Sequence, residues 1–203
     1  SVNTKAEATA EPAEPEQPAG LEKVEEEEKP NRFEVKLGSG GEIGGSFDDK
    51  TDLLVLLVQE IKADGKLARW NSANPSKAIQ RLDRLVSVAG KTGKNSVLVE
   101  AIQNASVSLD LVFERSIETT LELEKVKGQE LGLDVRYTPS GIGLMVENVF
   151  AGPVQDWNVA NSDAMVKAHD RITQVDDVAA DPAKMVQKLQ QNSKLKLTVL
   201  RMK

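Results

Sequence analysis

The chain contains only two tryptophans, and each begins the same phrase. Residues 70–88 read WNSANPSKAIQRLDRLVSV, and residues 157–175 read WNVANSDAMVKAHDRITQV. The Trp-Asn pair, the Ala-Asn pair, the Asp-Arg pair and the closing Val all recur at one constant shift of 87 positions. Agreement of this length predicts that one folding unit was duplicated within the chain.

Residues on either side of the phrase extend the match at slightly different shifts. Before it, a shift of 88 aligns Glu42-Ile43-Gly44 with Glu130-Leu131-Gly132; after it, a shift of 86 aligns Arg115 with Arg201. Small loop insertions between matched elements are what duplication leaves behind. A period of about 85 residues is longer than the 20–50 residues of solenoid repeats. The pattern therefore predicts two small domains joined near residues 116–120.

The charge of the chain is concentrated in its first 31 residues. This segment holds nine Glu and three Lys, a net charge of −6 that equals the net charge of the whole chain. With few large apolar side chains it cannot bury enough surface to offset its conformational entropy. We expect an extended or disordered acidic tail over residues 1–31, then repeat 1 over residues 32–116 and repeat 2 over residues 117–203.

The apolar pattern within the repeats is mainly that of strands. Apolar residues alternate over 33–37, 109–113 and 195–199, which is the period of a half-buried strand. Strands are also predicted at 53–61, 82–88, 142–149 and 168–175, and helices near 75–80 and over 97–103 and 182–191, the last with Pro in its first turn. Each tryptophan is expected to anchor a short helix to its own unit. The predicted fold class is mainly β with short helices (α+β), as two partly open β-barrels or sandwiches in tandem.

The sequence lacks the residue types and motifs that several classes of protein function require. There is no cysteine and only one histidine, His169, so neither thiolate nor multi-histidine metal sites are available, and no Gly-x-Ser-x-Gly motif is present. We predict no enzyme activity, no catalytic residue, no metal and no cofactor. The neutral repeats argue against nucleic acid, and no apolar run reaches the ~20 residues of a membrane span. The missing cysteines fit an intracellular compartment; a targeting segment that precedes Ser1 could have been removed.

Three stretches of repeat 2 resemble the PDZ domain family. They are LGL at 131–133, VKAHDRITQVDD at 166–177, and MVQKLQQ followed by LKLTVLR. The first is similar to the apolar-Gly-apolar loop of the family, and the second to its V-x-x-G-D-R-I-x-x-V-N-G pattern. The chain departs from that pattern at Leu82 and His169, where the family has glycine. Repeat 1 has Gly45 where an apolar side chain is expected, which predicts a thinner groove floor.

The resemblance implies that a peptide is bound as an added strand between the second strand and the second helix of the domain. Carried over to repeat 2, the carboxylate-binding loop is Glu130, Leu131, Gly132 and Leu133, the pairing edge begins at Asp134 and Val135, and the helix presents Pro182, Val186 and Leu189. Glu130 would repel a ligand carboxylate. Family members that select Ser or Thr have His at the start of the helix, whereas this chain has Pro182 and Asn95, so an apolar or loose ligand choice is expected.

Two hypotheses about function follow, and a third is weaker. The first is a non-enzymatic scaffold or adaptor that binds the C-termini or internal strands of a protein or peptide partner. The second is a structural or accessory subunit with vestigial grooves, peripheral to a membrane protein complex; the Trp-Asn phrase is similar to phrases in repeated PDZ-like proteins of algae, which suggests a plastid photosystem, in the stroma or at the thylakoid surface. The third is an accessory piece of a protease or chaperone. Other motifs favour plain roles: Asp176, Asp177 and Asp181 a solvated loop, and the glycines of 38–45 a strand connection that lacks the Lys-Ser/Thr ending of a phosphate loop.

Overall fold

Two antiparallel sheets with four short α-helices make up the described part of the chain. The computed structural model describes residues 31–105 and 108–201, and residues 31–203 form one compact unit. The acidic tail was predicted over residues 1–31. Residues 1–30 lie outside the described residues, so only Asn31 of the predicted tail is described. None of the described helices is long and apolar enough to cross a membrane.

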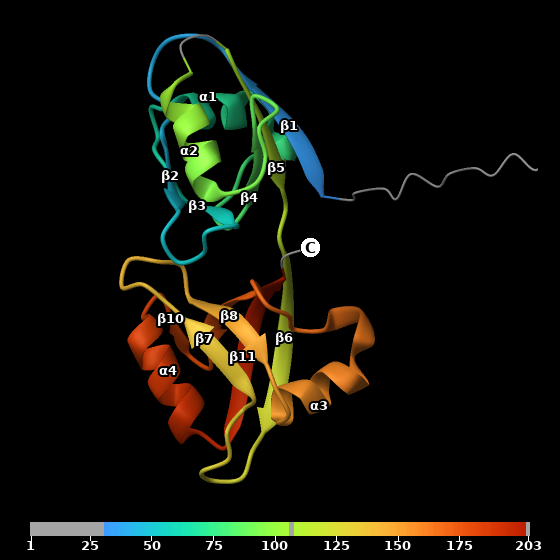
Figure 1. Cartoon of the computed structure of the whole chain (residues 1–203). Coiled ribbons are helices and arrows are strands. Elements are labelled where there is room, and N and C mark those ends of the chain that lie inside the picture. Colours follow the sequence, from blue (N-terminus) through green and yellow to red (C-terminus); the bar gives the residue numbers. More distant parts are fainter. Residues whose placement is uncertain (1–30, 106–107, 202–203) are drawn as a thin grey trace, which may run out of the picture. The chain divides into compact units, whose positions relative to one another are not determined.

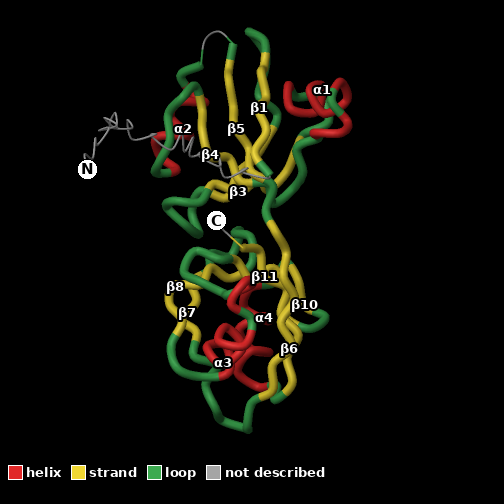
Figure 2. The backbone as a smooth tube through the Cα atoms, turned by 90° about the vertical axis from the view of Figure 1, so that its right-hand side faces the viewer, coloured by secondary structure: helices red, strands yellow, loops and turns green. Residues whose placement is uncertain are grey.

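The two repeats contain the same elements in the same order, except that repeat 2 has one additional short strand, β10 (Figures 1 and 2). Repeat 1 consists of β1 (Arg32–Leu37), β2 (Gly45–Asp48), β3 (Leu56–Ile61), α1 (Lys66–Ala73), the 3-10 helix η1 (Pro75–Lys77), β4 (Arg84–Val88), α2 (Asn95–Gln103) and β5 (Leu109–Glu114). Repeat 2 consists of β6 (Ile117–Glu124), β7 (Leu133–Arg136), β8 (Leu144–Val149), α3 (Pro153–Ala160), η2 (Ser162–Ala164), β9 (Arg171–Val175), β10 (Val178–Ala179), α4 (Pro182–Gln191) and β11 (Lys194–Arg201).

The strand order is the same in both sheets and leaves both of them open. It is β1-β5-β4-β3-β2 in repeat 1 and β6-β11-β9-β8-β7 in repeat 2, with β10 as an addition to β9. The first strand of each repeat does not pair with the second, so each sheet keeps β2 or β7 as an edge. Element starts follow the shifts read from the sequence: 88 from β3 to β8, and 87 from α1 to α3 and from β4 to β9. The duplication and the mainly β fold class are thereby confirmed.

Each repeat encloses its own apolar core, made mostly of Leu, Val and Ile. Trp70 is half-buried against the core of repeat 1, and Trp157 is half-buried against the core of repeat 2. In repeat 1 the ring of Phe33 stacks between Trp70 and Phe113, at centroid distances of 6.3 and 5.9 Å. The predicted role of the tryptophans, to hold a short helix against its own unit, is confirmed for both.

The asparagine that follows each tryptophan ties the helix to the loop behind it. Asn71 Nδ2 donates to the Ile79 carbonyl and its Oδ1 accepts from the Ile79 N–H, both at 2.8 Å. Asn158 makes the same two bonds with Val166, again at 2.8 Å. A side-chain amide that pairs with both polar groups of one backbone residue satisfies donors and acceptors that burial would otherwise leave costly. The repeated phrase is therefore a device for loop closure.

The first helix of repeat 1 lies earlier in the chain than the predicted position near residues 75–80. The α-helix is α1, at Lys66–Ala73, and only a 3-10 turn covers Pro75–Lys77. Asn74 ends the α-helix, and its Nδ2 donates to the Trp70 carbonyl (2.9 Å), so the proline that follows begins a new turn. In repeat 2, Pro153 is the first residue of α3. A Pro at the first helical position indicates such a start.

We predict that Asn158→Ala lowers the free energy of unfolding by about 2 kcal/mol, because it leaves the buried N–H and carbonyl of Val166 unpaired. Urea denaturation of the full chain measures the loss. Asn148→Ala is the control, since its side chain is exposed and its bond to Asp134 is long, at 3.5 Å; a change within about 0.5 kcal/mol is expected there. Equal effects of the two substitutions would contradict the proposed role of the Asn158 side chain.

Candidate functional site

The loop before β7 is held by glycines at points of close backbone approach. Gly132 has a φ of +76°, and a Cβ there would lie 2.7 Å from the carbonyl oxygen of Phe150. A Cβ on Gly152, the residue before α3, would meet Leu131 backbone atoms at 3.0 Å. Only glycine fits both the left-handed conformation and this packing. The loop is thereby pressed against the start of α3.

The carbonyl groups of this loop bond inward. The Gly132 carbonyl accepts from the Phe150 N–H (2.8 Å), and the Leu131 carbonyl accepts from the Val154 N–H (3.2 Å). Neither the Leu131 N–H nor the Gly132 N–H has a backbone acceptor among the described residues. Two donors without partners, next to a free strand edge, provide what an added strand with a terminal carboxylate would need.

The other residues expected at the groove divide between surface and core. Glu130 and Asp134 are exposed, and Leu133 and Val135 are half-buried on β7. On α4, Val186 is half-buried, while Pro182 and Leu189 are buried. Leu131 and Leu189 are each only 7% exposed and belong to the core of repeat 2. The described structure thus has a free strand edge at β7. The apolar side chains of Leu131 and Leu189, expected to line the groove beside it, are packed into the core of repeat 2.

Repeat 1 has the same loop but a different strand. The N–H groups of Ile43 and Gly44 also lack acceptors among the described residues. Gly45, however, leaves no hollow: a Cβ there would lie 2.7 Å from Leu67 Cδ1 and 3.6 Å from the ring of Phe47. The neighbouring side chains have taken up the space of the missing one, and the expectation of a thinner groove floor is corrected accordingly.

Asn95 closes the far end of the groove in repeat 1. β2 runs from the glycine loop to Asp48, so the segment that follows β2 marks the end of the edge. At the start of α2, Asn95 Nδ2 donates to the carbonyls of Asp52 (2.6 Å) and Val55 (3.2 Å), and its N–H donates to the Leu53 carbonyl (2.9 Å). Three bonds therefore join the helix to this segment across the path of a longer peptide.

The matching place in repeat 2 is open. Pro182 stands where repeat 1 has Asn95, and it carries neither an N–H nor a polar side chain. No hydrogen bond of the described residues joins the start of α4 to residues 137–143. A hollow of about 430 Å³ lies between residues 139–143, Thr173 and Ala179-Ala180, with Gln59 and Arg81 of repeat 1 also on its wall.

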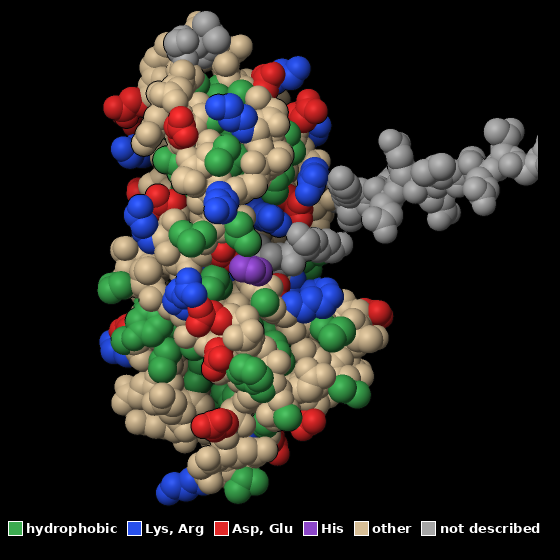
Figure 3. Space-filling model, in the orientation of Figure 1, with side chains coloured by type: hydrophobic (Ala, Val, Ile, Leu, Met, Phe, Trp, Pro, Cys, Tyr) green, Lys and Arg blue, Asp and Glu red, His purple; other side chains and the backbone are tan. Residues whose placement is uncertain are grey.

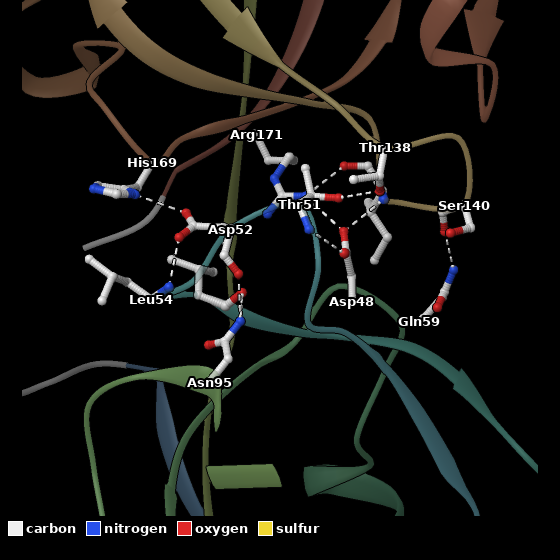
Figure 4. Close-up of polar contacts among 12 residues, drawn as sticks. Asp48, Thr51, Asp52, Leu54, Gln59, Asn95, Thr138, Ser140, His169 and Arg171 are labelled. Atoms are coloured by element: carbon white, nitrogen blue, oxygen red, sulfur yellow. Dashed lines mark hydrogen bonds and ion pairs between the residues drawn. The ribbon is translucent and has the colours of Figure 1, made fainter. Parts of the chain in front are cut away.

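A buried ion pair joins the two repeats (Figure 4). Arg171 Nη1 lies 2.9 Å from Asp48 Oδ2, with the two side chains 0% and 2% exposed. The same carboxylate oxygen accepts from the Ile142 N–H (2.8 Å), and the Thr51 N–H donates to Oδ1 (3.1 Å). Arg171 Nη1 also donates to the Ile142 carbonyl (3.0 Å). Its Nε and Nη2 are buried and find no acceptor among the described residues, which is rare for a guanidinium.

The pKa of Asp48 lies below its ordinary value of 3.8. Burial alone would raise the pKa, but the N–H groups of Ile142 and Thr51 and the positive charge of Arg171 together outweigh it. Burial lowers the pKa of Arg171, opposed by the Asp48 carboxylate. Both groups are therefore charged at neutral pH, and each makes the burial of the other tolerable.

The two positions where the family has glycine contribute to the same contact. Leu82 and His169 adopt left-handed φ values of +74° and +70°, which cost a non-glycine residue about 1–2 kcal/mol. Leu82 packs on the apolar cluster of Val55, Leu57, Ile142 and Leu200, and His169 Nδ1 lies 2.9 Å from Asp52 Oδ2. Both side chains thus reach the other repeat, where glycine could make no such contact.

The Asp-Arg pairs share one turn geometry, and in repeat 2 the arginine is buried. Asp83 Oδ2 accepts from the Gln80 N–H and Asp170 Oδ2 from the Lys167 N–H, both at 2.8 Å, so each aspartate caps the turn before a strand. The burial of Arg171 against Asp48 was not predicted. No spacing in the sequence links residues 123 positions apart, so only the fold identifies this partner.

The remaining carboxylates are engaged in local structure. Asp176 accepts from Asn192 and from the Lys196 N–H, Asp177 pairs with Lys188, and Asp181 caps α4 through the Lys184 N–H. Across residues 31–105 and 108–201 no group of three or more acidic, His or Cys side chains is placed to hold a metal ion.

Comparisons with known proteins bear on the fold alone. No protein-family model and no curated protein matches the chain. Among solved structures, INAD PDZ45 in complex with an NG2 peptide is 17% identical, with a TM-score of 0.36 over 85% of this chain and 90% of that one. INAD PDZ45 with NORPA CC-PBM is also 17% identical, with a TM-score of 0.35 over 85% and 92%. Dlg1 PDZ2 of the choanoflagellate Monosiga brevicollis is 18% identical, with a TM-score of 0.32 over 41% and 98%. These TM-scores are low, and nothing about the ligand of this chain follows from them.

The element order decides the fold class. In each repeat a strand, a glycine loop, two strands, a short helix, a strand, a second helix and a final strand follow one another, as the PDZ resemblance implied. The chain is a tandem of two PDZ-like domains. Within this PDZ-like tandem the second strand of each repeat is an edge, and the glycine loop precedes it.

We predict that Arg171→Met lowers the free energy of unfolding by about 3–5 kcal/mol, because it leaves the Asp48 carboxylate buried without its cation. Urea denaturation of the full chain provides the measurement. Arg136→Met is the matched control, since Arg136 and its partner Glu147 are both solvent-accessible, and a loss below about 1 kcal/mol is expected. Similar losses would show that the buried pair does not support the tandem.

We also predict an acid-dependent loss of the stability that Asp48 supplies. Because its folded pKa lies below 3.8, the contribution is complete above the unfolded pKa and is lost as pH falls through the folded pKa. Denaturation between about pH 6 and pH 3 should therefore show Asp48→Asn converging on the parent protein at the acid end. A constant difference across this range would contradict the assignment.

Proposed function

We propose that the chain is a non-enzymatic protein–protein interaction module in which repeat 2 binds an extended peptide, with a free C-terminus as the preferred ligand. We also propose that residues 32–116 and 117–203 are its two domains. The observation that carries the proposal is the pair of unpartnered N–H groups at Leu131 and Gly132, beside the free edge of β7. A peptide strand on β7 would place its terminal carboxylate at these donors.

The asymmetry of the repeats supports repeat 2 as the binding domain. In repeat 1, Phe47 and Leu67 fill the floor and Asn95 ties the helix across the far end. In repeat 2, no hydrogen bond of the described residues joins the start of α4 to residues 137–143. An incoming chain would gain backbone bonds from β7 without first breaking bonds within the protein.

The side chains around this edge favour an apolar ligand residue. Leu133, Val135 and Val186 are half-buried there and present apolar surface. Exposed Glu130 weakens carboxylate binding through repulsion, so a modest affinity is expected, and a ligand with basic residues upstream of its end would gain from it.

A second function, that of a structural subunit, is favoured by one observation. A buried ion pair and an apolar cluster hold repeat 1 to repeat 2. Two repeats held together in this way could serve as a spacer of fixed geometry in a larger assembly. The plastid, photosystem and membrane-complex hypotheses have no support in the described contacts and stay predictions.

The test of the peptide site uses matched positions on the two second helices. Val186 on α4 and Val99 on α2 are both half-buried and are related by the shift of 87. Fluorescence anisotropy of the full chain with a pool of labelled peptides ending in Val, Leu or Ile should show saturable binding. Val186→Lys should lower the affinity about tenfold or more, which corresponds to 1.4 kcal/mol, whereas Val99→Lys should leave it unchanged.

The same peptides with an amidated end are the chemical control. Loss of the terminal charge removes charge-assisted bonds worth about 1.5–3 kcal/mol each, so amidated peptides should bind at least about tenfold more weakly. Equal binding of both forms, or a loss caused by Val99→Lys alone, would overturn the assignment of the site to repeat 2.

A further inference from the structure

The glycine loop of repeat 1 lies beside three cations that come from other elements. A hollow of about 300 Å³ is lined by the side chains of Lys36 on β1 and of Lys66 and Arg69 on α1, together with Trp70 and residues 37–40. We call it the cationic pocket of repeat 1. No carboxylate lines it. The loop lacks the lysine of a phosphate-binding motif in sequence, but the fold places basic side chains next to it.

The three cations have no anionic partner in the described part of the chain. None of Lys36, Lys66 and Arg69 is within ion-pair distance of a described Asp or Glu side chain; Arg69 Nη1 donates to the Asp64 carbonyl at 2.7 Å. Acidic Glu42 and Asp64 line a neighbouring hollow of about 290 Å³, which shares Arg69 with this one. Like charges around one hollow repel one another, and a bound anion would remove that repulsion.

The loop adds donors that are not charged. The Ser39, Gly40 and Gly41 N–H groups have no backbone acceptor among the described residues, and the Ser39 side chain lines the hollow. Gly40 and Gly41 have φ values of +70° and +77°, which glycine alone adopts freely. Backbone N–H groups, a hydroxyl, an Arg fork and two Lys ammonium groups form the set that binds the oxygens of a phosphate group.

Repeat 2 provides an internal comparison at the same positions. The shifts of 88 and 87 align Lys36 with Glu124, Lys66 with Pro153 and Arg69 with Asp156, while Trp70 aligns with Trp157. The framework is the same, but three positive charges are replaced by two negative ones. The basic set is therefore no requirement of the fold, since the other copy folds with the opposite charge.

We propose that the cationic pocket of repeat 1 binds a dianionic phosphate group, and that this site is separate from the peptide edge of repeat 2. One Arg, two Lys and the N–H groups of the loop around one hollow favour a phosphate group over a single carboxylate. On the face shown in Figure 3, Lys and Arg side chains are interspersed with Asp and Glu, which fits a local site rather than a broad basic surface.

The test is a titration of the full chain with inorganic phosphate and with phosphoserine, followed by ¹⁵N NMR at constant ionic strength. Saturable shifts are expected for the amides of Ser39, Gly40 and Gly41 and for the indole of Trp70, with no shift for the indole of Trp157. Acetate at the same concentration is the comparison for a single negative charge, and it should bind at least about tenfold more weakly.

Two substitutions, Lys66→Ala and Arg69→Asp, remove positive charges that are also absent at the matching positions of repeat 2. Each should weaken phosphate binding about tenfold or more. Lys50→Ala is the matched control, because Lys50 is an exposed lysine of repeat 1 away from the pocket, and it should leave binding unchanged. Unchanged thermal melting would show that the variants are folded. Shifts that do not saturate, that acetate reproduces, or that persist in Arg69→Asp would overturn the proposal.

Discussion

The buried pair of Asp48 and Arg171 is the interaction on which the arrangement of the tandem depends. A guanidinium that is fully buried, with two of its three nitrogens unpartnered, is stable only where a fixed carboxylate faces it. That carboxylate lies at the end of β2, and the carbonyl that shares the guanidinium belongs to Ile142, in the loop after β7. Neither repeat can therefore bury this charge alone. Each repeat thus supplies groups that bury and neutralise the charge of the other.

The contact between the repeats involves the segment after β2 in repeat 1 and the segment after β7 in repeat 2, and these two segments differ in how they are held. The segment after β2 supplies Asp48, Thr51 and Asp52 to the contact, and Asn95 fastens the same segment to α2. The far end of the groove in repeat 1 is thereby closed by bonds to the same segment that contacts repeat 2. The segment after β7 receives the contact through Thr138, Ser140 and Ile142 but is not fastened to α4. The far end of the groove in repeat 2 therefore lacks the hydrogen bonds that close it in repeat 1, which supports repeat 2 as the proposed binding domain.

Sequence alone predicted what depends on period and on repetition. The alternation of apolar residues located most strands, Pro182 located the start of α4, and the constant shifts located the second copy of each element. The prediction placed the first helix too late in the chain, because Leu67 is the only buried residue of Lys66–Ala73 and the proline at 75 suggested a later start. The Asp48–Arg171 pair and the cationic pocket could not be predicted, because they join residues whose closeness only tertiary packing creates. The left-handed Leu82 and His169 were visible as departures from a glycine, but their contacts with the other repeat were not.

The central claim is that the unpartnered amides before β7 receive a peptide carboxylate. Amide hydrogen exchange at Leu131 and Gly132, measured residue by residue with and without a saturating apolar C-terminal peptide, tests it directly. The account predicts slowed exchange at these two amides and unchanged exchange at Ile43 and Gly44. Protection at Ile43 and Gly44 instead, or none at either loop while the peptide is bound, would contradict it.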